Sequence, residues 1–444
     1  MISPQWIRRA VLAALPALLA PPARAAAPTA EGDWDGALAV GGSKLRVALH
    51  LKPIPGGYAA SFDSPDQGAM GLPAAGVEGG DDALVVRFAF GQFKGALAPD
   101  GQTLAGTWTQ GGSTLPLSFV RRAPGGPVAT LDRPQIPAKP YPYRELEVAL
   151  DNPAAPGVKL AGTLTLPQGA GPFPAVVLIA GSGPSLRNEE VFGHPIFLVL
   201  ADHLTRAGIA VLRYDKRGIG GSTGDLAKAG LNEFASDAEA AFAWLKARPE
   251  IRAGKVGLIG HSEGGCVAPM IAALRRDVAF LVLLAAPAAQ GIELLERQNM
   301  ALARAAGASE PQVDDMIALK HRLFVAAATA ASADDAVSKI HALLVAARPE
   351  APAATLDAEA RAYASPALRS LLAYDPKPAL QAVRCPVLAL NGSKDLQVVA
   401  AQNLPLLRED LASNPDATVR ELPGLNHLFQ TAQTGSPAEY GRIE

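Results

Sequence analysis

Two different periods of apolar residues divide the chain. From Asp33 to about Arg122, apolar and polar residues alternate in short segments such as KLRVALHL, ALVVRFAF and LPLSFVRR. Turns rich in glycine, such as PGG, PDGQ and QGG, separate these segments. A period of two is typical of strands with one buried face, and the close spacing favours antiparallel neighbours. We therefore predict a small antiparallel all-β domain over residues 31–122, folded as a closed or nearly closed barrel or sandwich.

Two tryptophans in this region allow two interpretations. Trp34 and Trp108 either line a ligand cavity inside the β domain or fill its core. Filling the core is the commoner role of large aromatic residues in small barrels, and we favour it. Residues 123–142, APGGPVATLDRPQIPAKPYP, are rich in proline and glycine and predict an extended linker.

After the linker, residues 143–444 follow a different pattern. YRELEVAL and VKLAGTLTL predict an opening hairpin, and nearly unbroken apolar runs follow: PAVVLIAG, IAVLRYD, KVGLIG, FLVLLAAP and PVLALNG. Such runs are typical of parallel strands that are buried on both faces. Helical segments lie between them, which predicts an α/β fold with a doubly wound, mostly parallel sheet. An alanine-rich helical insertion at about residues 288–380 is much longer than an ordinary connection, and we predict that it caps the site.

The first 25 residues have the pattern of a signal peptide. Arg8 and Arg9 precede an apolar segment, Ala10 to Ala20, that is too short to span a membrane. Ala23-Arg24-Ala25 supplies small residues for cleavage after Ala25. We expect an exported protein, periplasmic or secreted, with no membrane span; an N-terminal anchor helix is the less favoured alternative.

Composition excludes several classes of partner. The 444 residues carry a formal net charge of −2, which gives no basic surface for nucleic acid. The two cysteines, Cys266 and Cys385, are too few for a disulfide framework, and we expect two separate buried thiols.

Ser262 is the candidate nucleophile. It lies in GLIGHSEGG, between a predicted buried strand and a predicted amphipathic helix, with Gly260 and Gly264 two residues to either side. These glycines permit a sharp turn and close packing of strand against helix, as in a nucleophile elbow. The pattern G-x-S-x-G alone is weak, but this strand-to-helix context makes it specific.

His427 is the candidate general base. A serine hydroxyl needs a base to accept its proton. The neighbouring His261 should point to the opposite face of an extended strand. The other histidines lie in the β domain, before the serine or in the helical insertion: His50, His194, His203, His321 and His341. His427 follows the last predicted strand, at the same sheet edge as Ser262.

Asp395 is the candidate partner of that base. It ends PVLALNGSKD, at the carboxyl end of a predicted parallel strand, where binding residues collect. Asp375 precedes the strand and Asp410 lies on the following helix, so both are weaker candidates. The order Ser262, Asp395, His427 is that of α/β-hydrolases.

Two backbone amides are expected to form an oxyanion hole. Glu263 directly follows the nucleophile and supplies one amide. We expect the other from Ser182 in the glycine-rich bend AGSGPS, with Gly181 and Gly183 as neighbouring candidates; a plain strand-to-helix turn is the alternative for this bend. A carboxylate beside an oxyanion hole opposes negative charge, so we predict that Lys216 or Arg217 pairs with Glu263.

These motifs resemble the α/β-hydrolase superfamily, and within it exported bacterial serine esterases of the serine aminopeptidase-like (S33) group. LIAGSGP, RYDKRGIGGSTGD, GLIGHSEGG, NGSKDLQV and LPGLNHLFQ carry the resemblance, which covers about residues 143–444. It implies ester hydrolysis through an acyl-enzyme with no metal and no organic cofactor. The chain differs in two places. First, Ala180-Gly181 replaces the usual histidine-glycine before the oxyanion loop. Second, Ser436 to Glu439 have the pattern of a helix start, but the given sequence ends at Glu444, so we expect an incomplete or unusually short C-terminus.

The resulting hypothesis is a carboxylesterase that acts on small-molecule esters with short- to medium-chain acyl groups. One alternative is an aminopeptidase-like serine peptidase, whose cap would hold an α-amino group with carboxylates such as Glu293, Glu296, Asp314 or Asp315. Another is a non-catalytic protein that binds an apolar ligand. The oligomeric state does not follow from the sequence.

Overall fold

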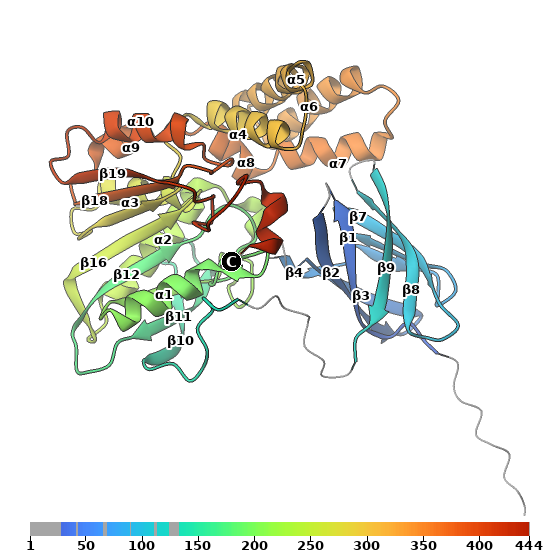
Figure 1. Cartoon of the computed structure of the whole chain (residues 1–444), viewed down its shortest axis with the longest axis horizontal. Coiled ribbons are helices and arrows are strands. Elements are labelled where there is room, and N and C mark those ends of the chain that lie inside the picture. The colour runs from blue at the N-terminus through green and yellow to red at the C-terminus, as the bar shows by residue number, and fades with distance from the viewer. Residues whose placement is uncertain are drawn as a thin grey trace, which may run out of the picture.

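The computed structural model describes residues 28–443 except 41–42, 65–68, 89, 111–112 and 124–132. The predicted signal peptide and the first part of the predicted linker therefore lie outside the described residues. The described chain forms an all-β part and a larger α/β part, shown side by side in Figure 1.

The N-terminal part is one nine-stranded antiparallel sheet. Its strands are Gly32–Val40 (β1), Ser43–Ile54 (β2), Gly57–Ser64 (β3), Ala69–Pro73 (β4), Gly76–Glu78 (β5), Leu84–Phe88 (β6), Gly91–Leu97 (β7), Thr103–Gln110 (β8) and Ser113–Arg121 (β9). The order β4-β3-β2-β1-β9-β8-β7-β6-β5 joins the first and last strands at the middle of the sheet. Hydrogen bonds from the amide of Ala74 to Ala60 and from the amide of Ala75 to Arg87 bring the two outer edges together.

The curled sheet encloses its own apolar core. Trp34 and Trp108 are 0% and 2% exposed, and Trp108 stacks on Phe62 with ring centroids 4.8 Å apart. Both tryptophans therefore fill the core, as we favoured over a ligand cavity.

The second sheet has eight strands in the order β10-β11-β15-β12-β16-β17-β18-β19. They are Arg144–Asp151 (β10), Lys159–Leu166 (β11), Phe173–Ile179 (β12), Ala210–Tyr214 (β15), Ile251–His261 (β16), Leu281–Leu284 (β17), Val387–Gly392 (β18) and Ala417–Leu422 (β19). The opening hairpin is antiparallel, β11 also pairs antiparallel with β15, and every later pairing is parallel. A separate two-stranded ribbon consists of Glu190–Val191 (β13) and His194–Pro195 (β14).

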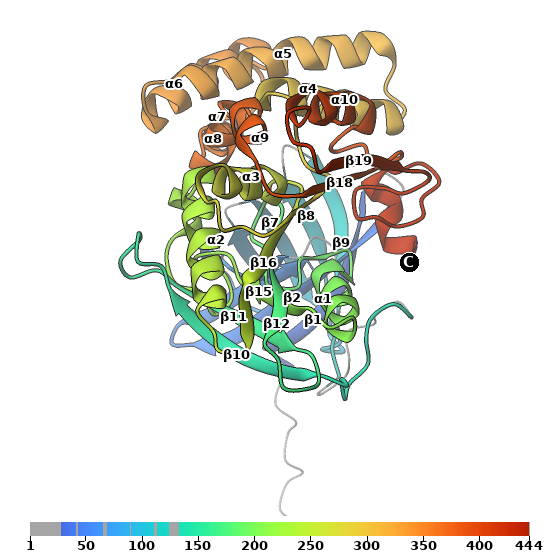
Figure 2. The same ribbon diagram turned by 90° about the vertical axis from the view of Figure 1, so that its left-hand side faces the viewer.

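Helices cover both faces of this sheet. The described helices of this part, including those of the cap, are Ile196–Arg206 (α1), Leu226–Lys228 (η2), Leu231–Lys246 (α2), Gly264–Leu274 (α3), Gly291–Ala305 (α4), Glu310–Thr329 (α5), Ala333–Ala347 (α6), Ala353–Tyr363 (α7), Pro366–Leu372 (α8), Lys377–Ala382 (α9), Ala400–Asp410 (α10) and Pro437–Arg442 (η3). Figure 2 shows α1 on one side of the sheet and α2 and α3 on the other.

Strand β12 explains why the apolar run has no polar alternation. Val176 and Leu178 pack in the cluster that contains α1, whereas Val177 and Ile179 pack in the cluster that contains α2 and α3. Because successive side chains of a strand point to opposite faces, a strand between two helical layers must be apolar at every position. The predicted doubly wound α/β-hydrolase sheet is confirmed.

The predicted cap region holds α4 to α8, which have an apolar cluster of their own. These helices lie together at the top of Figures 1 and 2, beyond α3. Among the described residues no helix is both long enough and apolar enough to cross a bilayer. Cys266 is buried in α3 and Cys385, just before β18, is half-buried; neither forms a disulfide.

The C-terminal segment lies between the two parts of the chain, next to β2 (Figure 1). The hydroxyl of Ser436 accepts a hydrogen bond from the amide of Ala438 at 3.2 Å and begins the short 3₁₀ helix η3, at the predicted position of a helix start. Arg133, from the linker, donates to the carbonyl oxygens of Ile443 and Phe192. These contacts fasten the linker and the C-terminal segment to the loop that contains Phe192.

Candidate active site

Ser262 lies on a sharp turn between β16 and α3. Its backbone φ is +53°, a left-handed value that is uncommon for a residue with a side chain. The turn needs glycine on both sides. A Cβ atom on Gly260 would lie 2.1 Å from the carbonyl oxygen of Gly264, and one on Gly264 would lie 2.0 Å from that of Ile179. This is the geometry of a nucleophile elbow, which exposes a serine hydroxyl above the ends of the strands.

His427 and Asp395 form a buried pair. Nδ1 of His427 lies 2.8 Å from Oδ2 of Asp395, and the two side chains are 5% and 0% exposed. The other carboxylate oxygen accepts hydrogen bonds from the amides of Gln397 and Val398. Because a carboxylate accepts, Nδ1 carries the proton and Nε2 is left as the acceptor nitrogen of the ring.

The weaker aspartate candidates lie elsewhere. Asp375 accepts a hydrogen bond from the amide of Lys377, and Asp410 contacts the side chains of Gln381 and Lys377. Neither lines the cavity that contains Ser262.

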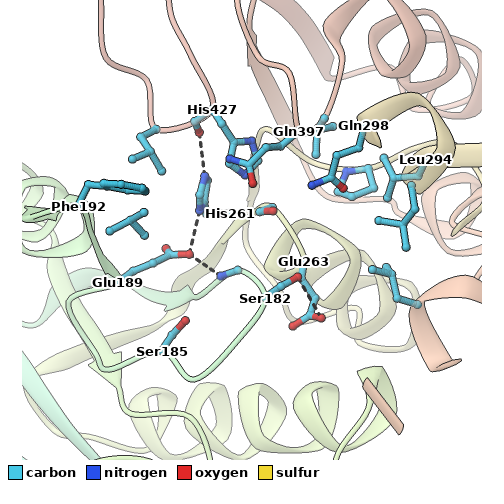
Figure 3. Close-up of a pocket in the computed structure, with 18 residues that line it drawn as sticks. Ser182, Ser185, Glu189, Phe192, His261, Glu263, Leu294, Gln298, Gln397 and His427 are labelled. Carbon is cyan, nitrogen blue, oxygen red and sulfur yellow. Dashed lines mark hydrogen bonds and ion pairs between the residues drawn. The ribbon is translucent and has the colours of Figure 1, made fainter. Parts of the chain in front are cut away.

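One cavity of about 320 Å³ brings the predicted site residues together. Ser182, Ser262, Glu263 and His427 all line it, and Asp395 lies directly behind His427. Figure 3 shows this cavity, with Phe192 on one side and Leu294 and Gln298 of α4 on the other. Its apolar lining comes from several segments: Val191, Phe192, Leu294, Leu295, Leu371, Val398 and Leu428.

The two predicted oxyanion amides lie at the ends of neighbouring segments. Ser182 follows β12, and Glu263 immediately precedes α3. In the described part of the chain, no hydrogen bond leads from either amide to another protein group. Both N–H groups therefore remain free to donate to a bound oxygen.

Lys216 is the residue that neutralises Glu263. Its Nζ lies 2.8 Å from Oε1 of Glu263, and both side chains are buried. Arg217, the other predicted partner, instead forms two hydrogen bonds with Asp237. Of the two alternatives that the sequence left open, the structure selects Lys216.

A second buried pair, Glu189 and His261, was not identified from the sequence. Oε1 of Glu189 lies 2.9 Å from Nδ1 of His261 and accepts the amide of Gly181 at 2.5 Å. Nε2 of His261 lies 3.0 Å from the backbone oxygen of His427, as Figure 3 shows. Because both partners of His261 are acceptors, only the protonated ring satisfies both contacts. The pair thus connects the loop after β12 to the loop that carries His427.

The pKa of His261 fits this arrangement. Burial acts to lower it, but the charge and hydrogen bond of Glu189, together with the His427 carbonyl, raise the pKa above its ordinary value. The prediction that His261 does not act on Ser262 agrees with both ring nitrogens being occupied. In the sequence, the only signal that could have identified His261 as a site residue is its position next to Ser262. No motif near Glu189 indicates that this carboxylate belongs to the site.

The remaining histidines and the cap carboxylates do not line this cavity. His50 lies between Asp33 and Asp63 in the N-terminal sheet, and His194 contacts the backbone oxygen of Tyr440. His321 pairs with Glu296 of the cap. The four cap carboxylates considered for an α-amino group, Glu293, Glu296, Asp314 and Asp315, lie outside the cavity.

A nucleophile elbow, a buried His–Asp pair and two free amides surround one cavity on an α/β-hydrolase fold, an arrangement that is typical of serine hydrolases. Comparison with known families agrees. Residues 156–414, more than half of the chain, match the family described as X-Pro dipeptidyl-peptidase (S15 family). The chain belongs to this family.

Several known proteins are similar to the chain. Esterase EstD of Thermotoga maritima is 29% identical over 284 residues, which cover 63% of this chain and 61% of EstD. An uncharacterised protein of Mycobacterium tuberculosis is 33% identical over 129 residues, 29% of this chain and 41% of that protein. The chain thus matches less than two thirds of the length of either relative.

Solved structures of similar fold include the Pyrococcus furiosus esterase PF2001 and Est1E from Butyrivibrio proteoclasticus. The first has a TM-score of 0.40 and 17% identity, over 64% of this chain and 83% of its own. The second has a TM-score of 0.40 and 16% identity, over 64% and 90%.

The elbow predicts a strong effect of one added methyl group. Gly264→Ala should lower the free energy of unfolding by roughly 2–4 kcal/mol, because its Cβ would collide with the backbone of β12. Urea unfolding measures the change. Gly254→Ala, on the strand β16 that leads into the turn, is the control, since its Cβ would meet nothing within 4 Å. Equal stability of the two variants would contradict this account of the turn.

The Glu189–His261 pair predicts a pH-dependent contribution to stability. A raised pKa in the folded state means that the pair stabilises fully below the ordinary histidine pKa, and that this stabilisation disappears as pH rises through the folded-state pKa. The difference in melting temperature between wild type and His261→Gln should therefore be larger at pH 6 than at pH 9. His203→Gln, at an exposed histidine, should show no such trend. A difference independent of pH would mean that His261 is not protonated in the fold.

Proposed function

We propose that this serine hydrolase is a carboxylesterase that cleaves small-molecule esters through an acyl-enzyme. Ser262 is the nucleophile, His427 the general base and acid, and Asp395 the group that orients His427 and stabilises its charged form. The amides of Ser182 and Glu263 bind the oxyanion. No metal or organic cofactor takes part in this scheme.

The reaction follows from these positions. Nε2 of His427 accepts the proton of Ser262 as Oγ bonds to the acyl carbon, and the carbonyl oxygen becomes an oxyanion that the two amides stabilise. The C–O bond to the alcohol then breaks, and His427 returns the proton to the departing oxygen. In the second half a water molecule loses a proton to His427 and attacks the acyl-enzyme, which releases the acid and restores Ser262.

The pairing of the carboxylates in the cavity is the observation that favours an ester. Glu263 is neutralised by Lys216, and Glu189 by His261. A peptidase that binds the N-terminal α-amino group of its substrate needs a carboxylate that is not already neutralised by a cationic side chain of the protein. Much of the remaining cavity wall is apolar, including Val191, Phe192 and Leu428, and it suits a hydrocarbon acyl group.

Cavity size supports short- to medium-chain acyl groups. A volume of about 320 Å³ is near the lower end of ligand pockets, which span roughly 300–1,000 Å³. The cap contributes Leu294, Leu295 and Leu371 to the wall, so we propose that these side chains limit acyl length.

Peptidase activity is the second candidate, because the chain belongs to a family described by X-Pro dipeptidyl-peptidase activity. The esterase assignment is supported in turn by the similarity to EstD. The resemblance to S33 esterases and export by a cleaved signal peptide remain proposals that rest on the sequence motifs and the first 25 residues.

The two enzymatic candidates predict opposite substrate preferences. With purified protein, p-nitrophenyl butyrate should be turned over at least about 100-fold faster than an alanyl-proline p-nitroanilide, because no unpaired carboxylate in the cavity wall anchors the amine. Initial rates of nitrophenol and nitroaniline release measure this. Faster release of nitroaniline would identify a peptidase instead.

The proposed roles also predict graded losses of activity. Asp395→Asn should lower kcat about 10⁴-fold with little change in the fold, because the amide no longer holds His427 in the required tautomer.

Ser262→Ala should abolish covalent labelling by a fluorophosphonate probe, whereas the wild-type protein should be labelled. Absence of labelling in folded wild type would support the third hypothesis, a non-catalytic binding protein.

A further inference from the structure

We propose that Lys216 is a positioning residue that aims the oxyanion-binding amide of Ser182 into the cavity. The inference rests on the proposed function, because it assigns a role to a residue that supports the reacting groups. Lys216 does not line the cavity itself.

The ammonium group of Lys216 has a complete set of partners. Nζ donates to the carbonyl oxygen of Gly181 at 2.7 Å and to Oε1 of Glu263 at 2.8 Å. It also lies 4.3 Å from the centre of the Phe234 ring, within the range of a cation–π contact. With a side chain only 7% exposed, Lys216 is held in one place by these three groups.

The contact with Gly181 determines where the next amide points. The carbonyl of Gly181 and the N–H of Ser182 belong to one planar trans peptide group, so they point in opposite directions. Because Lys216 binds the oxygen on one side, the N–H is directed to the other side, where no protein acceptor is found in the described residues. Without Lys216, this peptide would be free to rotate and turn its oxygen toward the substrate.

The preceding peptide group is held separately. The amide of Gly181 donates to Glu189, whose position depends on His261. A Cβ atom on Gly181 would lie only 2.8 Å from Oε1 of Glu189 and 3.1 Å from Cβ of Ser262. Gly181 is therefore held at its N–H by Glu189 and at its oxygen by Lys216. Of the described residues, only Lys216 forms a hydrogen bond with the peptide group that carries the Ser182 amide.

Lys216 also connects the two oxyanion donors. Its second partner, Glu263, supplies the other amide, and the hydroxyl of Ser182 contacts Oε2 of Glu263 at 3.3 Å. An unpaired carboxylate at this point would oppose the negative charge that develops on the substrate oxygen. One ammonium group thus orients the first donor and neutralises the residue of the second.

The test compares Glu263→Gln with the double variant Lys216→Met/Glu263→Gln. The double variant is neutral, of similar volume and free of a buried unpaired charge, so it differs from the single variant in the ammonium group and its bond to Gly181. We expect kcat for p-nitrophenyl butyrate to fall about 10- to 100-fold between them, with KM changed by less than about threefold. Affinity for an alkyl trifluoromethyl ketone, which forms the oxyanion, should fall by the same factor as kcat.

A matched control removes the neighbouring buried ion pair. Arg217→Met/Asp237→Asn eliminates the contacts at 2.7 Å between these side chains but does not touch Gly181. It should lower the melting temperature and leave kcat within about threefold of wild type. If the two double variants lose stability and kcat in parallel, or if the Lys216 variant keeps the kcat and inhibitor affinity of Glu263→Gln, the positioning role is wrong.

A separate readout distinguishes this inference from the proposed function. Fluorophosphonate labelling also places a negative oxygen in the oxyanion hole, and it needs no ester turnover. If wild type is labelled but does not hydrolyse esters, the substrate assignment is wrong, and a 10-fold or larger drop in labelling rate from Glu263→Gln to Lys216→Met/Glu263→Gln still supports the role of Lys216. Equal labelling rates would overturn it. If this double variant does not fold, Lys216→Leu/Glu263→Gln, which also has no hydrogen-bond donor at position 216, takes its place with the same expected drop.

Discussion

The close approach of β16, α3 and β12 at Ser262 is the constraint on which the site depends. Carbonyl oxygens occupy the places where Cβ atoms of residues 260 and 264 would lie, so the backbone can make this turn only with glycine there. The left-handed conformation of Ser262 is thereby imposed by packing, not by local preference. The same contact brings the start of α3 beside the end of β12, and so brings together the two predicted oxyanion amides.

Around this turn, loops from different strands are joined by three buried pairs, of which two are ion pairs and the third, His427 with Asp395, is a hydrogen bond to a carboxylate. Lys216 with Glu263, His261 with Glu189 and His427 with Asp395 connect the segments that follow β15, β12, β16, β18 and β19. Burying such charges costs solvation energy, which a well-aligned partner offsets, so each pair restricts its loops to one arrangement. The site is thus held in place by paired charges above an apolar sheet, and the cavity retains apolar walls for the substrate.

Much of the fold and of the candidate site could be predicted because it is encoded locally. Strands such as Phe173–Ile179 are apolar at successive positions, and GLIGHSEGG joins another apolar strand to a helix. Ser262, Asp395 and His427 each follow a predicted parallel strand, and parallel strands end at a common edge. Glu189 was missed for a different reason. It lies 72 residues from His261, and no pattern along the chain indicates that a buried carboxylate there will contact Gly181.

The sequence by itself determined the period of each segment, the turn at Ser262 and the order of the three predicted catalytic residues, since these depend on neighbours a few positions apart. It limited the expected partner of Glu263 to Lys216 or Arg217. It could not decide between them, because both are cationic and adjacent, and only the folded backbone determines which side chain points toward Glu263. The tertiary structure decides between them. Arg217 pairs with Asp237 on α2, whereas Lys216 forms hydrogen bonds with Gly181 and Glu263. Buried charges select partners by distance in space, and only the packed fold decides those distances.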